Sequence, residues 1–162
     1  PVDPSYLSWK LKSLDFSARF IELATEINNA MPDHVVDRCA ALLNEQRLAV
    51  NGSKILILGV AYKKDVGDMR ESPALDVVAG LAKRGAEIRF HDPHVQEFEV
   101  EGHGYKGIEL TDEALADADL VVVLTDHSDV DYARAARHAT RIFDTRNATR
   151  GVVEGRERIT KL

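Results

Sequence analysis

The spacing of apolar residues divides the chain into two parts that meet near residue 50. From about Ala18 to Arg47, apolar residues recur at steps of mostly three and four, which places them along one face of an α-helix. Pro32 lies inside this pattern and is expected to kink the helix or to divide it in two. A shorter helix is expected ahead of it, from Pro4 toward Leu14. The apolar positions of the long helix are Phe20, Leu23, Ala24, Ile27, Met31, Val35, Cys39, Leu42 and Leu43.

After residue 52 the pattern changes to short apolar runs that alternate with helical segments. The runs predict strands at 54–60, 87–91, 119–125 and 141–144, and the remaining periodic segments predict helices near 73–84, 112–117 and 131–138. Continuous apolar runs are typical of a parallel sheet that is covered on both faces. Three glycines within 102–107 predict a flexible surface loop. The expected fold class is therefore α/β: a Rossmann-like, mainly parallel sheet flanked by helices and preceded by a long helical segment.

The apolar face of the long helix needs a covering partner. A helix ahead of a compact domain cannot bury its whole stripe on that domain, so we expect a homodimer in which a second copy of the chain covers it. The alternative is that the stripe packs entirely within its own subunit. On this basis we divide the chain into a helical linker and dimerisation segment, 1–50, and an α/β domain, 51–162.

Composition and charge limit the classes of partner. The 162 residues are 44% hydrophobic and 30% charged, as in a folded globular chain, and the net charge of −6 gives no general attraction for nucleic acid or for acidic membranes. No apolar run approaches the roughly 18–20 residues needed to cross a bilayer. The single cysteine, Cys39, excludes an internal disulfide and fits a reducing cytoplasm. Any site for an anion must therefore be local.

The segment 59–73 is the most informative about chemistry. It follows the first predicted strand and ends at Ser72-Pro73, which is typical of a helix N-cap followed by proline at the first helical position. Loops at the carboxyl ends of parallel strands and helix N-termini both bind anions. The basic residues of this loop, Lys63, Lys64 and Arg70, therefore indicate a phosphorylated ligand. The alternative is a set of solvated loop charges, because acidic neighbours nearly cancel them: Asp65, Asp68 and Glu71.

The same segment resembles the signature of the UDP-glucose/GDP-mannose dehydrogenase family, whose members use NAD to oxidise the C6 alcohol of a nucleotide sugar to a carboxylate. The match continues through 74–77, 85–87, 91–93 and 144–147. Segments 2–4 and 19–24 are most similar to the branch that acts on UDP-N-acetylhexosamines for polysaccharide biosynthesis, in particular the N-acetylmannosamine type. A UDP-glucose dehydrogenase is the alternative within the family. The resemblance implies that 51–162 binds the UDP-sugar.

The resemblance also implies roles for individual residues. Tyr62 and Lys63 match an aromatic-lysine pair that contacts the nucleotide sugar, and Arg146 matches an arginine that helps to hold the substrate. Arg70 matches an arginine that reaches across to NAD on another domain. Asp3 matches an aspartate that orients or activates water during hydrolysis of a thioester intermediate, although Asp3 on its own is also an ordinary helix N-cap.

Two parts of the family's machinery are missing from this sequence. The family's catalytic cysteine lies in Cys-Ile-Pro-Val-Asp-Pro, and this chain begins at the first proline of that motif. The turn at 59–62 lacks the second and third glycines of a dinucleotide fingerprint, so NAD is expected mainly on an absent N-terminal domain. We therefore expect a piece of a longer enzyme that is inactive alone. A hypothesis of another class is a non-catalytic nucleotide-binding or dimerisation module.

The remaining candidates for chemistry are given structural interpretations. Cys39 lies on the apolar helical face, which favours a buried structural thiol. The segment 91–94, His-Asp-Pro-His, has ligand types but no paired spacing on a helix, and we expect no metal site. Asp126-His127 follows the third predicted strand, a position from which it can contribute to a nucleotide pocket.

Overall fold

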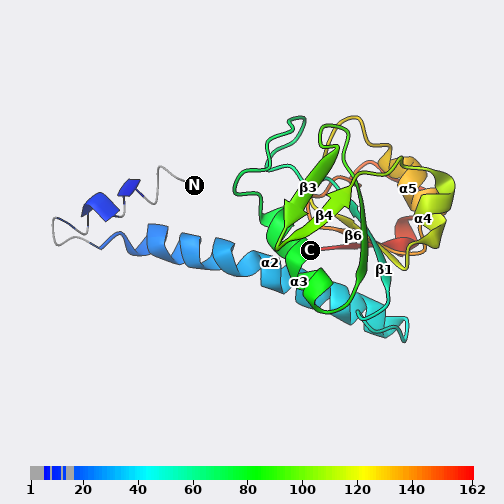
Figure 1. The fold of residues 1–162 in the computed structure, drawn as a ribbon, viewed down its shortest axis with the longest axis horizontal. Coiled ribbons are helices and arrows are strands. Elements are labelled where there is room, and N and C mark those ends of the chain that lie inside the picture. Colours follow the sequence, from blue (N-terminus) through cyan, green and yellow to red (C-terminus); the bar gives the residue numbers. More distant parts are fainter. Residues whose placement is uncertain (1–5, 8, 12, 14–16) are drawn as a thin grey trace.

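The computed structural model describes residues 6–7, 9–11, 13 and 17–162 (Figure 1). Asp3, the expected catalytic aspartate, lies outside the described residues, as do both ends of the short helix expected from Pro4 to Leu14. Residues 6–7 and 9–11, inside that span, are helical. Within the described ranges, no helix combines the length and the apolar character that a bilayer crossing requires.

The centre of the domain is a five-stranded parallel sheet, which confirms the expected fold class. The strand order is β2-β1-β5-β6-β7, and every neighbouring pair is parallel. Four strands of this sheet, β1, β2, β5 and β6, match the four predicted runs, whereas β7 was not predicted. The strands are β1 (Lys54–Leu58), β2 (Glu87–His91), β5 (Leu120–Val123), β6 (Ile142–Asp144) and β7 (Ile159–Lys161), the last preceded by a 3₁₀ turn at Arg156–Arg158.

Helices cover both faces of the sheet, so alternate residues of the central strands enter two separate cores. Ile55 and Ile57 of β1 pack in the core on the side of α2 (Arg19–Glu45) and α3 (Pro73–Lys83). Leu56 and Leu58 enter the opposite core, under α4 (Asp112–Asp117) and α5 (Tyr132–His138). Because both faces are buried, the strands need continuous apolar residues, and the sequence has them.

The long helix α2 continues through Pro32 as one element. Of the two outcomes expected at Pro32, division into two helices is wrong. Proline removes one backbone donor, but Pro32 itself is buried and the helix C-terminal to it packs firmly in the domain. Close packing is visible at Gly80 of α3, where an added Cβ atom would lie 2.9 Å from Cγ2 of Val36.

The chain itself covers only part of the apolar stripe of α2. Val35, Cys39, Leu42 and Leu43 are buried in the core beside α3. The N-terminal half of the helix extends beyond the domain (Figure 1), and its apolar side chains are exposed: Phe20 89%, Leu23 52% and Ile27 53%. The described residues therefore leave this half of the stripe uncovered.

A β-hairpin replaces the flexible loop that the glycines of 102–107 predicted. Strand β3 (Glu97–Val100) pairs antiparallel with β4 (His103–Lys106) through a turn in which Glu101 and Gly102 have φ values of 49° and 77°. Two positive φ angles in succession are the geometry of a tight hairpin turn, which glycine favours. Stacking of Phe98 on Tyr105, with ring centroids 5.0 Å apart, holds the hairpin.

Candidate functional site

The strand order places a candidate site at the carboxyl ends of β1 and β5. From β1 the chain passes through α3 to β2 on one side, whereas β5 and β6 are added on the other side. Ligands of doubly wound sheets bind outside the carboxyl ends of the strands at such a reversal of order. The loops that meet there are 59–72 after β1 and 124–131 after β5, and the loop 145–151 after β6 lies next to them.

The two ends of the loop 59–72 lie side by side and are joined by a hydrogen bond. The hydroxyl of Ser72 donates to the carbonyl of Val60 at 2.8 Å, and it accepts from the N–H of Ala74 at 3.4 Å as the N-cap of α3. The helix starts with Pro73 at its first position, as predicted. Thr125, at the end of β5, donates its hydroxyl to the carbonyl of Ala61 at 2.6 Å and ties the loop to the neighbouring strand.

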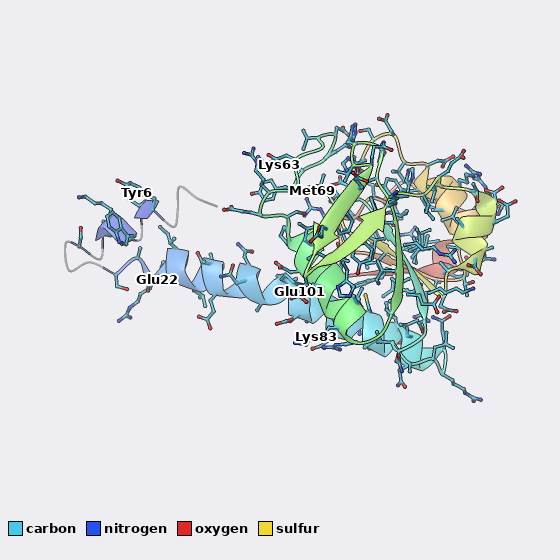
Figure 2. The ribbon with its side chains drawn as sticks, viewed as in Figure 1. Tyr6, Glu22, Lys63, Met69, Lys83 and Glu101 are labelled. Atoms are coloured by element: carbon cyan, nitrogen blue, oxygen red, sulfur yellow. The ribbon has the colours of Figure 1, made fainter. Side chains whose placement is uncertain are left out.

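Tyr62 and Lys63 stand together in this loop. The Lys63 Nζ atom lies 5.3 Å from the centroid of the Tyr62 ring, within the range of a cation–π contact. Lys63 is exposed and, among the residues that the structure describes, forms no ion pair. In Figure 2 it extends from the periphery of the domain. Its charge and its three donors therefore remain available to an anion.

Arg70 is engaged within its own loop. Its Nε and Nη2 atoms donate to the two carboxylate oxygens of Asp68, at 3.0 and 2.8 Å. These hydrogen bonds lower the pKa of Asp68 to about 2. The Arg70 side chain is nevertheless 89% exposed, so this pair is open to exchange with another anion.

Arg146 lies in the loop after β6, whose shape depends on the buried carboxylate of Asp144. One oxygen of Asp144 accepts from the N–H groups of Arg146 (3.0 Å) and Ala148 (3.1 Å), and the other from the N–H (2.8 Å) and the hydroxyl (2.5 Å) of Thr149. Burial alone would raise the pKa of Asp144, but these donors stabilise the anion and hold its pKa below the usual value. The Arg146 guanidinium reaches the β5 loop, with Nε 3.7 Å from Oδ1 of Asp126.

An open hollow of about 350 Å³ lies beside Arg146. Residues of the β6 loop and the end of β7 line it: Asp144, Thr145, Arg146, Asn147, Lys161 and Leu162. The Lys161 ammonium donates to the side-chain carbonyl of Asn147. Tyr62 and Lys63 do not line this hollow.

The loop 124–131 after β5 contacts both the loop that carries Lys63 and the loop that carries Arg146. Asp65, two residues after Lys63, accepts from the N–H of Ser128 at 2.7 Å and from its hydroxyl at 2.9 Å. Two residues earlier in the β5 loop, Asp126 contacts Arg146. Lys63 and Arg146 therefore belong to loops at the same edge of the sheet, on either side of the loop that follows β5.

Asp92 is a site residue that sequence reasoning missed. It follows β2, and its carboxylate has no exposure to solvent. It lies 3.0 Å from Nε2 of His127, whose ring is also fully buried. The available signals were the family match at 91–93 and position, because Asp92 and His127 each follow the end of a strand at this edge.

The atoms of Asp65, His94 and His127 lie within 4.8 Å of one another, a spacing that suits a metal ion. Two of the three groups, His127 and Asp65, already form hydrogen bonds. The two ring nitrogens of His127 are hydrogen-bonded to the N–H of Asp65 and to Asp92, and both oxygens of Asp65 accept from Ser128. A metal ion bound to Nδ1 of His127 would have to displace the N–H of Asp65, so we interpret the cluster as a hydrogen-bond network.

The chain resembles known proteins in sequence and in structure. Residues 56–151 match the model of the UDP-glucose/GDP-mannose dehydrogenase family, UDP binding domain. The UDP-N-acetyl-D-mannosamine dehydrogenase of Methanococcus maripaludis is 34% identical over 90% of this chain and 33% of its own length. The solved UDP-N-acetyl-mannosamine dehydrogenase of Staphylococcus aureus is 32% identical, with a TM-score of 0.65 over 89% of this chain and 33% of that protein.

A solved UDP-glucose dehydrogenase from Pyrobaculum islandicum matches 98% of this chain and 35% of its own, with a TM-score of 0.73 and 22% identity, and shows the fold alone. The chain thus spans about a third of the length of the curated relatives it matches.

Proposed function

Because the chain belongs to the UDP-glucose/GDP-mannose dehydrogenase family, we propose that it is the UDP-binding part of an NAD-dependent UDP-N-acetylhexosamine 6-dehydrogenase. The substrate that we favour is UDP-N-acetylmannosamine, the sugar in the names of the relatives at 32–34% identity. The whole enzyme would oxidise the C6 alcohol to a carboxylate for polysaccharide biosynthesis. A UDP-glucose dehydrogenase is the less supported alternative, since the likeness to one at 22% identity concerns only the fold.

The observation that carries this proposal is the placement of Lys63 and Arg146 in loops at one edge of the sheet, on either side of the β5 loop. A diphosphate carries concentrated negative charge, and Lys63 forms no ion pair among the described residues that would compete with it. The ring of Tyr62 beside Lys63 offers an apolar face for stacking. These features suit a nucleoside diphosphate better than they suit an uncharged ligand.

The other parts of the reaction are assigned by the family. We propose that NAD is held mainly by a separate domain, and that Arg70 contacts it after exchanging its Asp68 partner for the cofactor. We assign to Asp3 the orientation of water for thioester hydrolysis. Both assignments concern the longer enzyme.

We also propose that the enzyme is a homodimer, joined through the N-terminal half of α2. Phe20, Leu23 and Ile27 present an exposed apolar face there, on a part of the helix that extends beyond the domain (Figure 1). An apolar face of this kind on a soluble helix favours association with another helix. The free thiol of Cys39 fits a reducing compartment such as the cytoplasm.

Calorimetric titration of the chain with UDP and, separately, with NAD tests the proposal. We expect binding of UDP and a loss of about tenfold in UDP affinity for Lys63→Ala. Lys64→Ala is the matched control, because it removes the same charge one residue away, where Asp65 partly neutralises it. Binding of NAD without UDP would contradict the assignment of this domain, and so would equal UDP affinity for Lys63→Ala and the wild type.

A further inference from the structure

The loop that carries Tyr62 and Lys63 contains two backbone conformations that cost conformational free energy. Asp65 and Glu71, neither of them glycine, have φ values of 59° and 57°. Non-glycine residues in the left-handed region persist only where surrounding contacts enforce them. Two buried side chains, those of Asp92 and His127, supply such contacts.

The carboxylate of Asp92 binds the beginning of the loop. Its Oδ2 atom accepts from the N–H groups of Val60, at 2.8 Å, and Ala61, at 3.3 Å, directly before Tyr62. Its Oδ1 atom accepts from the N–H of His94 at 2.8 Å. Because the carboxylate is fully buried, each of these bonds is protected from competition with water.

The imidazole of His127 binds the loop on the other side of Tyr62 and Lys63. Its Nδ1 atom lies 2.9 Å from the backbone nitrogen of Asp65, and its Nε2 atom lies 3.0 Å from Oδ2 of Asp92. A backbone N–H can only donate, so Nδ1 must be the acceptor and the proton must reside on Nε2, which donates to Asp92. The ring is neutral and its orientation is fixed from both ends.

We infer that His127 is a positioning residue that, together with Asp92, fixes the backbone on both sides of Tyr62 and Lys63 in the shape that receives a nucleoside diphosphate. The ligand part of this inference rests on the proposed function. The two anchors, at residues 60–61 and at residue 65, leave only residues 62–64 between them. A loop held in its binding shape before the ligand arrives pays less conformational entropy on binding.

The chemistry of histidine explains why this residue stands at the position. A buried polar ring is costly unless its polar atoms are bonded, so a packing role alone would favour an apolar side chain. Neutral imidazole has an acceptor on one edge and a donor on the other, which is what the Asp65 N–H and the Asp92 carboxylate require. The ring of His94, with its centroid 4.9 Å from that of His127, packs beside it.

The first test needs no substitution. Nitrogen NMR of the imidazoles in the labelled chain distinguishes the two neutral tautomers of His127. We expect a bare Nδ1 and a protonated Nε2. A proton on Nδ1 would overturn the inference, because that nitrogen could then not accept from Asp65. This measurement decides the question even if the variants below fail to fold.

The second test compares three substitutions of His127. His127→Phe keeps the shape and removes both bonds, His127→Gln retains a donor toward Asp92, and His127→Asn places a carbonyl oxygen near the position of Nδ1. We expect amide exchange of Asp65 to accelerate in the Phe and Gln variants, with about a tenfold loss of UDP affinity in each. His127→Asn should restore most of the protection and of the affinity.

The exchange and binding measurements separate two kinds of failure. If exchange of the Asp65 amide is the same in His127→Phe as in the wild type, the anchoring role is overturned while UDP binding still stands. If exchange accelerates as expected but the wild-type chain binds no UDP, the anchoring role is supported and the proposed function is overturned.

Discussion

A Cβ atom added to Gly59 would lie 2.4 Å from the carbonyl oxygen of Thr125. Gly59 follows β1 and Thr125 follows β5, the two strands between which the order of the sheet reverses. The backbones meet so closely there that only a residue without a side chain fits. Gly59 also has a φ of 79°, which glycine adopts without strain. This contact determines where the loop 59–72 leaves the sheet.

Replacing Gly59 by alanine is therefore expected to destabilise the fold strongly. The left-handed backbone costs an alanine about 1 kcal/mol, and the clash with Thr125 adds about 2 kcal/mol or more. Gly102→Ala is the matched control, because Gly102 has a φ of 77° and nothing within 4 Å of an added Cβ atom. Urea denaturation should show a loss of about 3 kcal/mol at 59 and about 1 kcal/mol at 102. Equal losses of unfolding free energy at the two positions would show that the clash with Thr125 does not contribute.

Asp144→Asn is expected to destabilise the domain by about 2 kcal/mol at neutral pH, because an amide satisfies the surrounding donors less well than a carboxylate. The ionised carboxylate of Asp144 accepts four hydrogen bonds, which come from Arg146, Ala148 and Thr149. Thr145→Ala is a suitable control in the same loop, since Thr145 bonds to Val123 and not to Asp144.

The contribution of Asp144 should depend on pH. Its pKa is lower in the folded than in the unfolded chain, where it is about 3.9. The stabilisation is therefore complete above that value and is lost as the pH falls through the lower, folded pKa. Denaturation at a series of pH values should show the difference between wild type and Asp144→Asn shrinking below pH ~4. A difference that stays constant down to pH ~2 would contradict this account.

Cys39 is expected to resist thiol reagents in the folded chain. It lies on α2 and is fully buried in the core beside α3, and burial raises the pKa of its thiol to about 12. Only the thiolate reacts, so labelling by a disulfide reagent should occur at the rate of unfolding. Rapid labelling of the native chain at neutral pH would show that α2 opens far more readily than its packing indicates.

The proposed dimer surface is tested by adding charge to it. Ile27→Glu places a carboxylate in the exposed apolar face and should raise the dissociation constant of the dimer at least about tenfold. Asn29→Glu introduces the same charge at an exposed position about 200° around the helix and should leave association unchanged. Sedimentation equilibrium measures both. A monomeric wild type, or equal effects of the two substitutions, would contradict the proposed dimer surface.

The sequence was sufficient wherever the physical cause is local. The apolar runs of β1 and β5 and the Ser72-Pro73 start of α3 depend on neighbouring residues, and all three form where the pattern predicts. The hairpin at 97–106 and the three-residue β7 were missed. These segments are short and polar, and they become strands only through pairing with a neighbouring segment.

The candidate site shows the same limit. The segment 59–73 was found because basic residues follow a predicted strand, and Arg146 was found through the family resemblance. The role of Asp92 was not, because its partners Val60 and His127 lie 32 and 35 residues away in the sequence. Two buried groups that meet only through the parallel sheet leave no periodic or spacing signal. Their pairing required the strand order β2-β1-β5.

The central claim is that UDP binds at the carboxyl edge of β1, β5 and β6. Amide NMR spectra of the labelled chain during a UDP titration test it most directly, since each shifted signal reports a position. The account predicts that the shifts concentrate in 59–72, 124–131 and 144–149, with saturation at one affinity. Shifts confined to α4 and α5, or none at millimolar UDP, would contradict it.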